Sequence, residues 1–242
     1  MIIVADSHGN ELNPDCAEAI STVIADFKPK IRIHLGDAWN LAALRRGADE
    51  VDQGESIKDD FIGAENFLRS FFKGGEDNYY LHGNHDAPRL EQFARSPRAM
   101  IREAAEDGLE EMASILRRNR CTVLPYDSRL GVLRLGHLKA IHGYAHGINA
   151  ARIMARVYGN VVMGHVHTIE TVPVESIDGP SEARVIGAAC NVDQPYNARQ
   201  VNKLRHENGF AYGYLFDDGS YVLFQARRIN GRMVYATDFK GI

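Results

Sequence analysis

Short apolar runs alternate with amphipathic segments along the first two thirds of the chain. Ile2–Ala5, Ile31–Leu35 and Asn78–His82 have the length and composition of buried strands. Pro14–Phe27 and Lys58–Phe72 instead repeat their apolar positions near helical spacing. This β-α-β-α-β order predicts a parallel or mixed sheet covered by helices, and therefore an α/β fold.

Residues 88–119 interrupt this alternation. They are rich in Glu, Arg, Ala, Leu and Met, and Pro88 and Pro97 stand where helices commonly begin. We expect one or two inserted helices here, which could cap a site and restrict access to it. The pattern then resumes with the short strands Cys121–Leu124, Gly131–Leu135 and Leu138–His142, the helix Ala150–Tyr158 and the strand Asn160–Met163.

After residue 168 the pattern is typical of an all-β segment. Asp217-Asp218-Gly219 and Asn230-Gly231 are strong hairpin signals. We expect this part to form a second sheet packed on the first, within a single domain that covers residues 1–242. Its expected strands are Thr168–Val174, Ala183–Gly187, Phe210–Phe216, Tyr221–Arg227 and Arg232–Ala236.

Composition excludes some classes of function. The chain has 242 residues, 45% of them hydrophobic and 25% charged, which is ordinary for a globular protein. Its formal net charge of −4 provides no general basic field, which argues against a passive nucleic-acid binder. Nuclease activity is still compatible with this charge, because bound metal ions would add local positive charge.

The cysteines and the first residues indicate the compartment. The spacing of Cys16, Cys121 and Cys190 matches neither a CxxC zinc site nor a disulfide framework, so we expect a reducing, cytoplasmic setting. Met1–Ala5 lacks the basic region and the longer apolar stretch of a signal peptide. No run approaches the length of a membrane span, and we expect no membrane association.

Metal-ligating side chains follow the apolar runs at several points. Asp6 and His8 are two residues apart, as are His165 and His167, so each pair would share one face of a strand. Strand ends meet along one edge of a parallel sheet, where we expect such side chains to gather. The five segments are Asp6-Ser7-His8, Gly36-Asp37, Gly83-Asn84-His85-Asp86, His142-Gly143 and Gly164-His165-Val166-His167.

The donor types narrow the chemistry. A mixed Asp, His and Asn set without cysteine favours Mn²⁺, with Fe, Zn²⁺ and Ni²⁺ as alternatives, and disfavours a structural zinc. The set is large enough for two divalent ions, and one shared Asp could bridge them at about 3.5–4 Å. Pairs of this kind serve in-line displacement at phosphorus, because they activate a water molecule and neutralise phosphoryl charge.

The five segments, in this order, resemble the motifs of the calcineurin-like metallophosphoesterase superfamily. The resemblance extends from Asp6 to His167. It implies a four-layer α-β-β-α sandwich, in which two mixed sheets pack face to face between flanking helices. It also implies a dinuclear centre in which Asp6, His8 and His167 bind one ion, Asn84, His142 and His165 bind the other, and Asp37 bridges them.

The resemblance further implies a phosphoester hydrolase. A hydroxide that bridges the ions would attack phosphorus in line, with His85 contacting the phosphate or protonating the leaving group. Asp86 would hold the His85 ring through a hydrogen bond. Many members carry an acidic residue or Tyr three positions after the residue corresponding to Asp37. This chain has Asn40 there, which points away from the purple acid phosphatase branch.

Simpler explanations exist for single segments. Each motif alone could be a polar turn, and only their joint occurrence in order favours metal binding. We interpret His34 and His82 as packed residues, and His146 as a surface-loop residue. Trp39 could either line the site or pack in the core.

The substrate class stays open between a phosphorylated small molecule or nucleotide and a phosphodiester such as nucleic acid. The acidic composition favours the smaller substrates. The alternative function is a catalytically silent scaffold of the same fold that binds a protein partner. A scaffold should have lost ligands, yet no ligand position is visibly replaced here.

Overall fold

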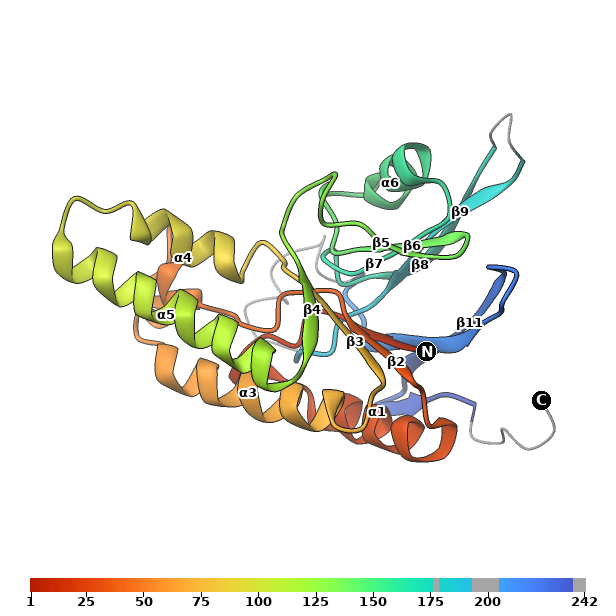
Figure 1. The fold of residues 1–242 in the computed structure, drawn as a ribbon, viewed down its shortest axis with the longest axis horizontal. Coiled ribbons are helices and arrows are strands. Elements are labelled where there is room, and N and C mark those ends of the chain that lie inside the picture. Colours follow the sequence, from red (N-terminus) through yellow and green to blue (C-terminus); the bar gives the residue numbers. More distant parts are fainter. Residues whose placement is uncertain (176–178, 193–204, 237–242) are drawn as a thin grey trace.

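The chain forms two β-sheets with helices on their outer faces (Figure 1). The computed structural model describes residues 1–175, 179–192 and 205–236. Within these ranges the first sheet has seven strands in the order β12-β11-β10-β1-β2-β3-β4. The parallel part comprises β1 (Ile2–Val4), β2 (Ile31–His34), β3 (Asp77–Leu81) and β4 (Cys121–Leu124), and the antiparallel part β10 (Gly209–Leu215), β11 (Tyr221–Ile229) and β12 (Arg232–Val234).

The second sheet is also mixed. Its five strands within the described ranges have the order β5-β6-β7-β9-β8. The central three are parallel and the outer two antiparallel, so again the carboxyl ends of several strands meet at one edge. The strands are β5 (Leu133–Leu135), β6 (Leu138–Ile141), β7 (Val161–Met163), β8 (Ile169–Val174) and β9 (Ser181–Ile186).

The two sheets pack face to face. Ile3 and Ile33 of the first sheet share one buried cluster with Leu138, Val162 and Ile186 of the second. Successive strand residues point to opposite faces, so Ile2 and Val4 are buried on the other side, under helices. The expected four-layer α-β-β-α sandwich is therefore confirmed.

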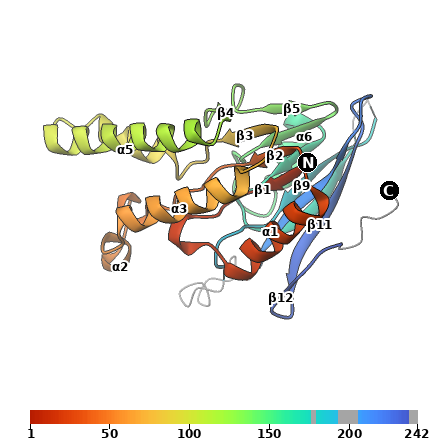
Figure 2. The same cartoon turned by 60° about the horizontal axis from the view of Figure 1, so that its bottom comes forward.

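The helices follow from local signals. The Asn13 side chain caps α1 (Pro14–Phe27) by accepting from the Cys16 amide, and Ser56 caps α3 (Ile57–Phe72) in the same way. Both cover the outer face of the first sheet, and α6 (Ala150–Tyr158) covers the second (Figure 2). The helix bounds differ from those predicted by at most one residue.

The segment 88–119 contains two helices, α4 (Ala87–Ala94) and α5 (Ala99–Arg118). They pack on each other where Leu90 meets the backbone at Gly108. Figures 1 and 2 show α5 extending well beyond the strands. A further short helix, α2 (Glu50–Gln53), was not predicted. The assignment of the whole chain to one domain stays a prediction.

One sequence-based expectation is wrong. The strands after residue 168 do not all form the second sheet, because β10, β11 and β12 extend the first sheet beside β1. Ile2 pairs with Tyr212 in an antiparallel ladder. Alternation and turn residues predict that a segment is a strand, but its pairing partner is chosen by packing across a distance of some 200 residues.

The helices within the described ranges are too short or too polar to span a membrane.

Candidate metal centre

The five polar segments of the sequence lie at the carboxyl ends of β1, β2, β3, β6 and β7. Main-chain hydrogen bonds join the first two, since the Asp6 amide donates to Gly36 O (3.0 Å) and the His8 amide to Asp37 O (3.0 Å). The carboxylates join the others. Asp37 Oδ1 accepts from the His85 amide and Asp6 Oδ2 from the His165 amide, both at 2.8 Å.

Two glycines permit this close approach. A Cβ at Gly83 would lie 2.1 Å from Asp37 Oδ1, and a Cβ at Gly164 would lie 2.5 Å from Asp6 Oδ2. Any side chain at these positions would displace a carboxylate. The glycines of the motifs therefore allow the loops of both sheets to pack against each other.

One group of donors surrounds His142 Nε2. Asn84 Oδ1 and His165 Nδ1 each lie 3.1 Å from it, and Asp37 Oδ2 lies 3.4 Å away. The other ring nitrogen of His142, Nδ1, is 2.9 Å from Leu35 O. This second contact orients the ring so that Nε2 faces the other donors.

A second group surrounds His167 Nε2. Asp6 Oδ1 and His8 Nε2 each lie 3.4 Å from it. Ligand atoms of His8, Asp37 and His85 also lie within 4.8 Å of one another. Asp37 therefore lies near His8 of the second group as well as His142 and His165 of the first. The structure brings all seven predicted metal-ligating side chains into one place, although their role as ligands stays a prediction.

The spacings are those of donors around a cation. Donor atoms bound at about 2.1 Å to one ion lie about 3.0–3.4 Å apart in octahedral or tetrahedral arrangement. The contacts around His142 and His167 fall in this range. In addition, Asp6 Oδ1 is buried without a hydrogen-bond partner in the described part of the chain. Cations would fit this donor set.

The backbone is strained at several of the candidate ligands. Nine non-glycine residues within the described ranges have φ between 46° and 69°, in the left-handed region. Such conformations persist where the surrounding structure enforces them, and they gather at functional sites. Five of the nine are candidate ligands, namely Asp6, His8, Asp37, His165 and His167.

The carboxylates of the site are buried and ionised. Burial by itself raises the pKa of Asp6, but the imidazole of His167 lowers it to about 2. The pKa of Asp37 is likewise raised by burial and held well below its usual range by His142 and His85. Burying carboxylates costs several kcal/mol each unless a cation compensates.

The imidazoles divide into two kinds. Burial lowers the pKa of His8 to about 4 and that of His85 and His165 to about 3, so these rings are neutral and offer a lone pair. His142 differs. Burial lowers its pKa, but the Asp37 carboxylate outweighs this effect and raises it to about 9.

The role expected for Asp86 requires a correction. Its carboxylate does not contact the His85 ring. It accepts from the Tyr80 hydroxyl (2.7 Å), the Gly83 amide (2.7 Å) and the Asp37 amide (2.9 Å). His85 Nδ1 has no hydrogen-bond partner among the described residues. Asp86 therefore holds two loops together through their main chains.

Two further residues that hold the loops of the site in place were not predicted from the sequence. Asp60, buried on α3, accepts from the amides of Asn40 and Leu41 at 2.8–3.1 Å. Arg89 on α4 donates to the carbonyl oxygens of the same two residues. Together they hold the loop after Asp37. A charged residue on the apolar face of an amphipathic helix is the signal that could have revealed Asp60.

The interpretations of single residues have different outcomes. His34 is fully buried beside Ser7, and Trp39 packs in the core rather than lining the site. His146 is exposed as expected, yet its Nδ1 lies 3.0 Å from His165 Nε2. The ring of His206 lies 5.1 Å from that of His167.

A cleft of about 130 Å³ opens onto the second donor group. His8, His85 and His167 line it, together with Asn40 and Arg45. Arg45 is paired with Asp52. No residue of α4 or α5 is among those described as lining the cleft, so the expected cap is not observed there.

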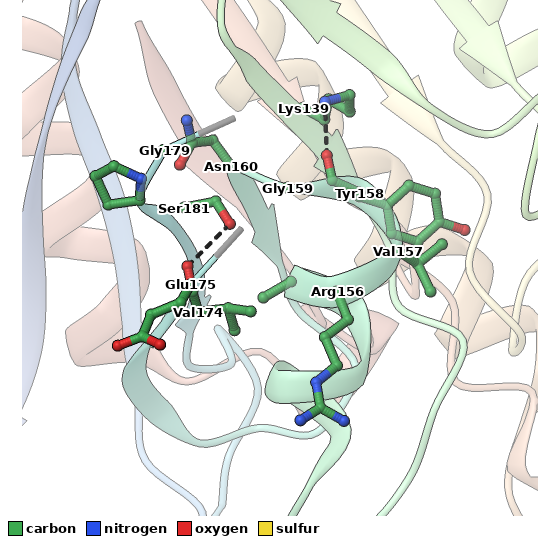
Figure 3. Close-up of a pocket in the computed structure, with 12 residues that line it drawn as sticks. Lys139, Arg156, Val157, Tyr158, Gly159, Asn160, Val174, Glu175, Gly179 and Ser181 are labelled. Atoms are coloured by element: carbon green, nitrogen blue, oxygen red, sulfur yellow. Dashed lines mark hydrogen bonds between the residues drawn. The ribbon is translucent and has the colours of Figure 1, made fainter. Parts of the chain in front are cut away.

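A larger cavity of about 450 Å³ lies between α6 and the β8–β9 hairpin (Figure 3). Two of its polar side chains are paired with main-chain carbonyls, since Lys139 Nζ donates to Tyr158 O (2.6 Å) and Ser181 Oγ to Val174 O (3.3 Å). None of its lining residues belongs to the metal-ligating groups of the described chain. The smaller cleft is therefore the candidate site.

Comparison with known proteins gave no match to a protein-family model and none to a curated protein. Solved structures of Vps29 are similar in fold. Wild-type Vps29 complexed with Zn²⁺ from Entamoeba histolytica is 12% identical, with 97% of this chain and 96% of that chain covered and a TM-score of 0.48. Vps29 from Chaetomium thermophilum is 12% identical, with 97% and 93% covered and a TM-score of 0.49. Likeness at this level does not bear on the chemistry of the site.

Proposed function

We propose that this chain is a metal-dependent phosphoesterase with two divalent ions, Mn²⁺ being the ion that the donor set favours most. The observation that carries the proposal is the convergence of seven donor side chains from both sheets at ligand-to-ligand spacing. The order of the motifs, which resembles that of the calcineurin-like metallophosphoesterases, supports it.

The two donor groups suggest how the ions are held. Asp37 stands between the groups and would be the shared ligand. Bound ions would supply a water molecule of lowered pKa and neutralise the charge on a phosphoryl group. Asp6, His8 and His167 would hold one ion, and Asn84, His142 and His165 the other.

His85 is the residue of the chain that we assign to the substrate itself. Its side chain lines the cleft and is 24% exposed, and its Nε2 lies 3.9 Å from Asp37 Oδ2. The ring is neutral because burial lowers its pKa to about 3. We therefore assign it a hydrogen bond donated to a phosphoryl oxygen, which becomes stronger as charge develops there.

The cleft suggests the substrate class. Arg45, which lines it, could turn from Asp52 toward an anionic group of the substrate. A volume of about 130 Å³ accommodates a phosphoryl group and part of its leaving group. The substrate that we propose is a phosphorylated small molecule or nucleotide. A single nucleic-acid strand is the alternative, and the activity measurements below distinguish the two.

The first experiment measures metal and activity together. Protein stripped with a chelator and reloaded with Mn²⁺ should bind about two ions per chain and hydrolyse nitrophenyl mono- or diesters, nucleotides or single-stranded DNA. Failure to retain ions after reloading would contradict the proposal. It would favour the alternative function, a scaffold that binds a protein partner.

The second experiment tests His85. The variant His85→Ala should keep its ions and lose about 100–1,000-fold in turnover, because the stabilising hydrogen bond is removed. His137→Ala, in the exposed turn between β5 and β6, is the matched control and should match the wild type. Loss of ions in His85→Ala would instead make His85 a ligand.

A further inference from the structure

Cys190 lies beside the candidate metal centre. The main chain after β9 returns to the end of β1, where the Ala189 amide donates to Ala5 O (2.9 Å) and the Cys190 amide to Asp6 O (2.8 Å). On its other side the Cys190 carbonyl accepts from Asn208 Nδ2 (2.5 Å). Cys190 is thus fixed next to the first carboxylate of the site.

The thiol of Cys190 belongs to the donor cluster. Its Sγ and one ring nitrogen each of His8 and His167 all lie within 4.8 Å of one another. Cys190 also lines the cleft together with these two histidines. The spacing of cysteines in the sequence did not indicate this, because the partners of Cys190 are distant in the chain.

Packing does not account for this position. Cys190 is 5% exposed, yet it is a member of none of the three apolar clusters found among the described residues. Cys16, in contrast, belongs to the cluster under α1, and Cys121 packs at its margin. Neither of these two joins a metal-ligating group in the described chain. Only Cys190 turns its sulfur toward the imidazoles.

We propose that Cys190 is a thiolate ligand of the ion held by Asp6, His8 and His167, an inference that rests on the proposed function. The thiol would give its proton to solvent when sulfur binds the ion, with no change of oxidation state. Thiolate favours Zn²⁺ over Mn²⁺, whereas the group around His142 has only nitrogen and oxygen donors. The two sites would therefore differ, the first selecting a thiophilic ion such as Zn²⁺.

Cobalt substitution tests this assignment. Protein reloaded with Co²⁺ should show visible d–d bands, which report any bound cobalt, and a near-ultraviolet thiolate-to-cobalt charge-transfer band. Cys190→Ser and Cys190→Ala should keep visible bands but lose the charge-transfer band. Cys121→Ser, on the edge strand β4, is the matched control and should keep both.

Metal competition provides a second measurement. The ratio of Zn²⁺ to Mn²⁺ affinity should fall by about tenfold or more in both Cys190 variants. Visible bands without a charge-transfer band in the wild type would overturn the assignment of Cys190 and leave the metal centre intact. Complete absence of cobalt bands would overturn the metal centre as well, so the two failures are distinguishable.

Discussion

At the scale of single residues, Asp37 is the side chain on which the site most depends. Its Oδ1 orients the His85 amide, and its Oδ2 lies 3.4 Å from His142 Nε2. It also belongs to a ligand-spaced group with His8. One carboxylate therefore lies near residues of both donor groups.

The variant Asp37→Asn should lose at least about 100-fold in turnover, because an amide bridges two cations poorly. Metal content per chain should fall with it. Asp26→Asn, on the exposed side of α1, is the control and should behave as wild type. Unchanged hydrolysis in Asp37→Asn would exclude a bridging role.

The proton on His142 couples metal binding to pH. Burial lowers its pKa, but Asp37 raises it to about 9 in the metal-free protein. A proton must therefore leave His142 when an ion binds at any pH below about 9. The apparent affinity should rise about tenfold per pH unit up to about pH 9 and level off above it.

Calorimetry in buffers of different protonation enthalpy measures this release, with about one proton expected at pH 7.5. The raised pKa of His142 also makes the stability of the metal-free protein depend on pH. The folded-state pKa is above the unfolded one, so the contribution of protonated His142 to stability is present below pH 6.5 and is lost as pH rises toward 9. Metal binding that is independent of pH would contradict the assignment of His142 as a ligand.

At the scale of elements, the site is built from loops that follow parallel strands. Each loop has a glycine or a buried hydrogen bond where the next loop approaches, as Gly83 does beside Asp37. Asp60 of α3 and Arg89 of α4 hold the loop after Asp37 from outside. Helices that cover the first sheet therefore also position its metal-ligating loops.

Gly83→Ala tests the packing of these loops. The added Cβ would lie 2.1 Å from Asp37 Oδ1, so we expect a loss of about 1–3 kcal/mol in the free energy of unfolding together with weaker metal binding. In the control Gly54→Ala, the Cβ would have its closest contacts at 3.4 Å, and stability should be nearly unchanged. Denaturant titration of both variants compares them, and equal stability would contradict the steric argument.

The accuracy of sequence reasoning at this scale depends on distance along the chain. The bounds of α1, β4 and α6 were predicted correctly, since caps, turn residues and periodicity act within a few residues. The pairing of β10 with β1 was not predicted. The antiparallel ladder joins Ile2 to Tyr212, and no feature of the sequence near either residue indicates its partner. Arg89 and Cys190 were missed as neighbours of the site for the same reason, whereas Asp60 had a local signal in its position on the apolar face of a helix.

At the scale of the whole molecule, the proposed ions would join the two sheets. His142 and His165 extend from the second sheet, and Asp37 and Asn84 from the first. Without cations, the buried carboxylates and imidazoles from the two layers would have only one another and a few main-chain groups as partners. Ions should thus stabilise the folded chain as well as support activity.

Addition of Mn²⁺ should raise the thermal midpoint. At a free concentration about 100-fold above Kd, binding contributes about 2.7 kcal/mol per site. This corresponds to about 5–10 °C for a chain of this size. Calorimetric scans with and without Mn²⁺ measure the shift, which Asp37→Asn should largely abolish. An equal shift in wild type and variant would locate the binding of Mn²⁺ elsewhere.

The sequence by itself determined the strand and helix segments and the donor residues at the strand ends, because those signals are local. The tertiary structure decided which strands share a sheet and that the donors of two sheets face each other at about 3 Å. It also placed a thiol beside two imidazoles. Such proximity arises from the packing of side chains distant in the chain, which local periodicity does not encode.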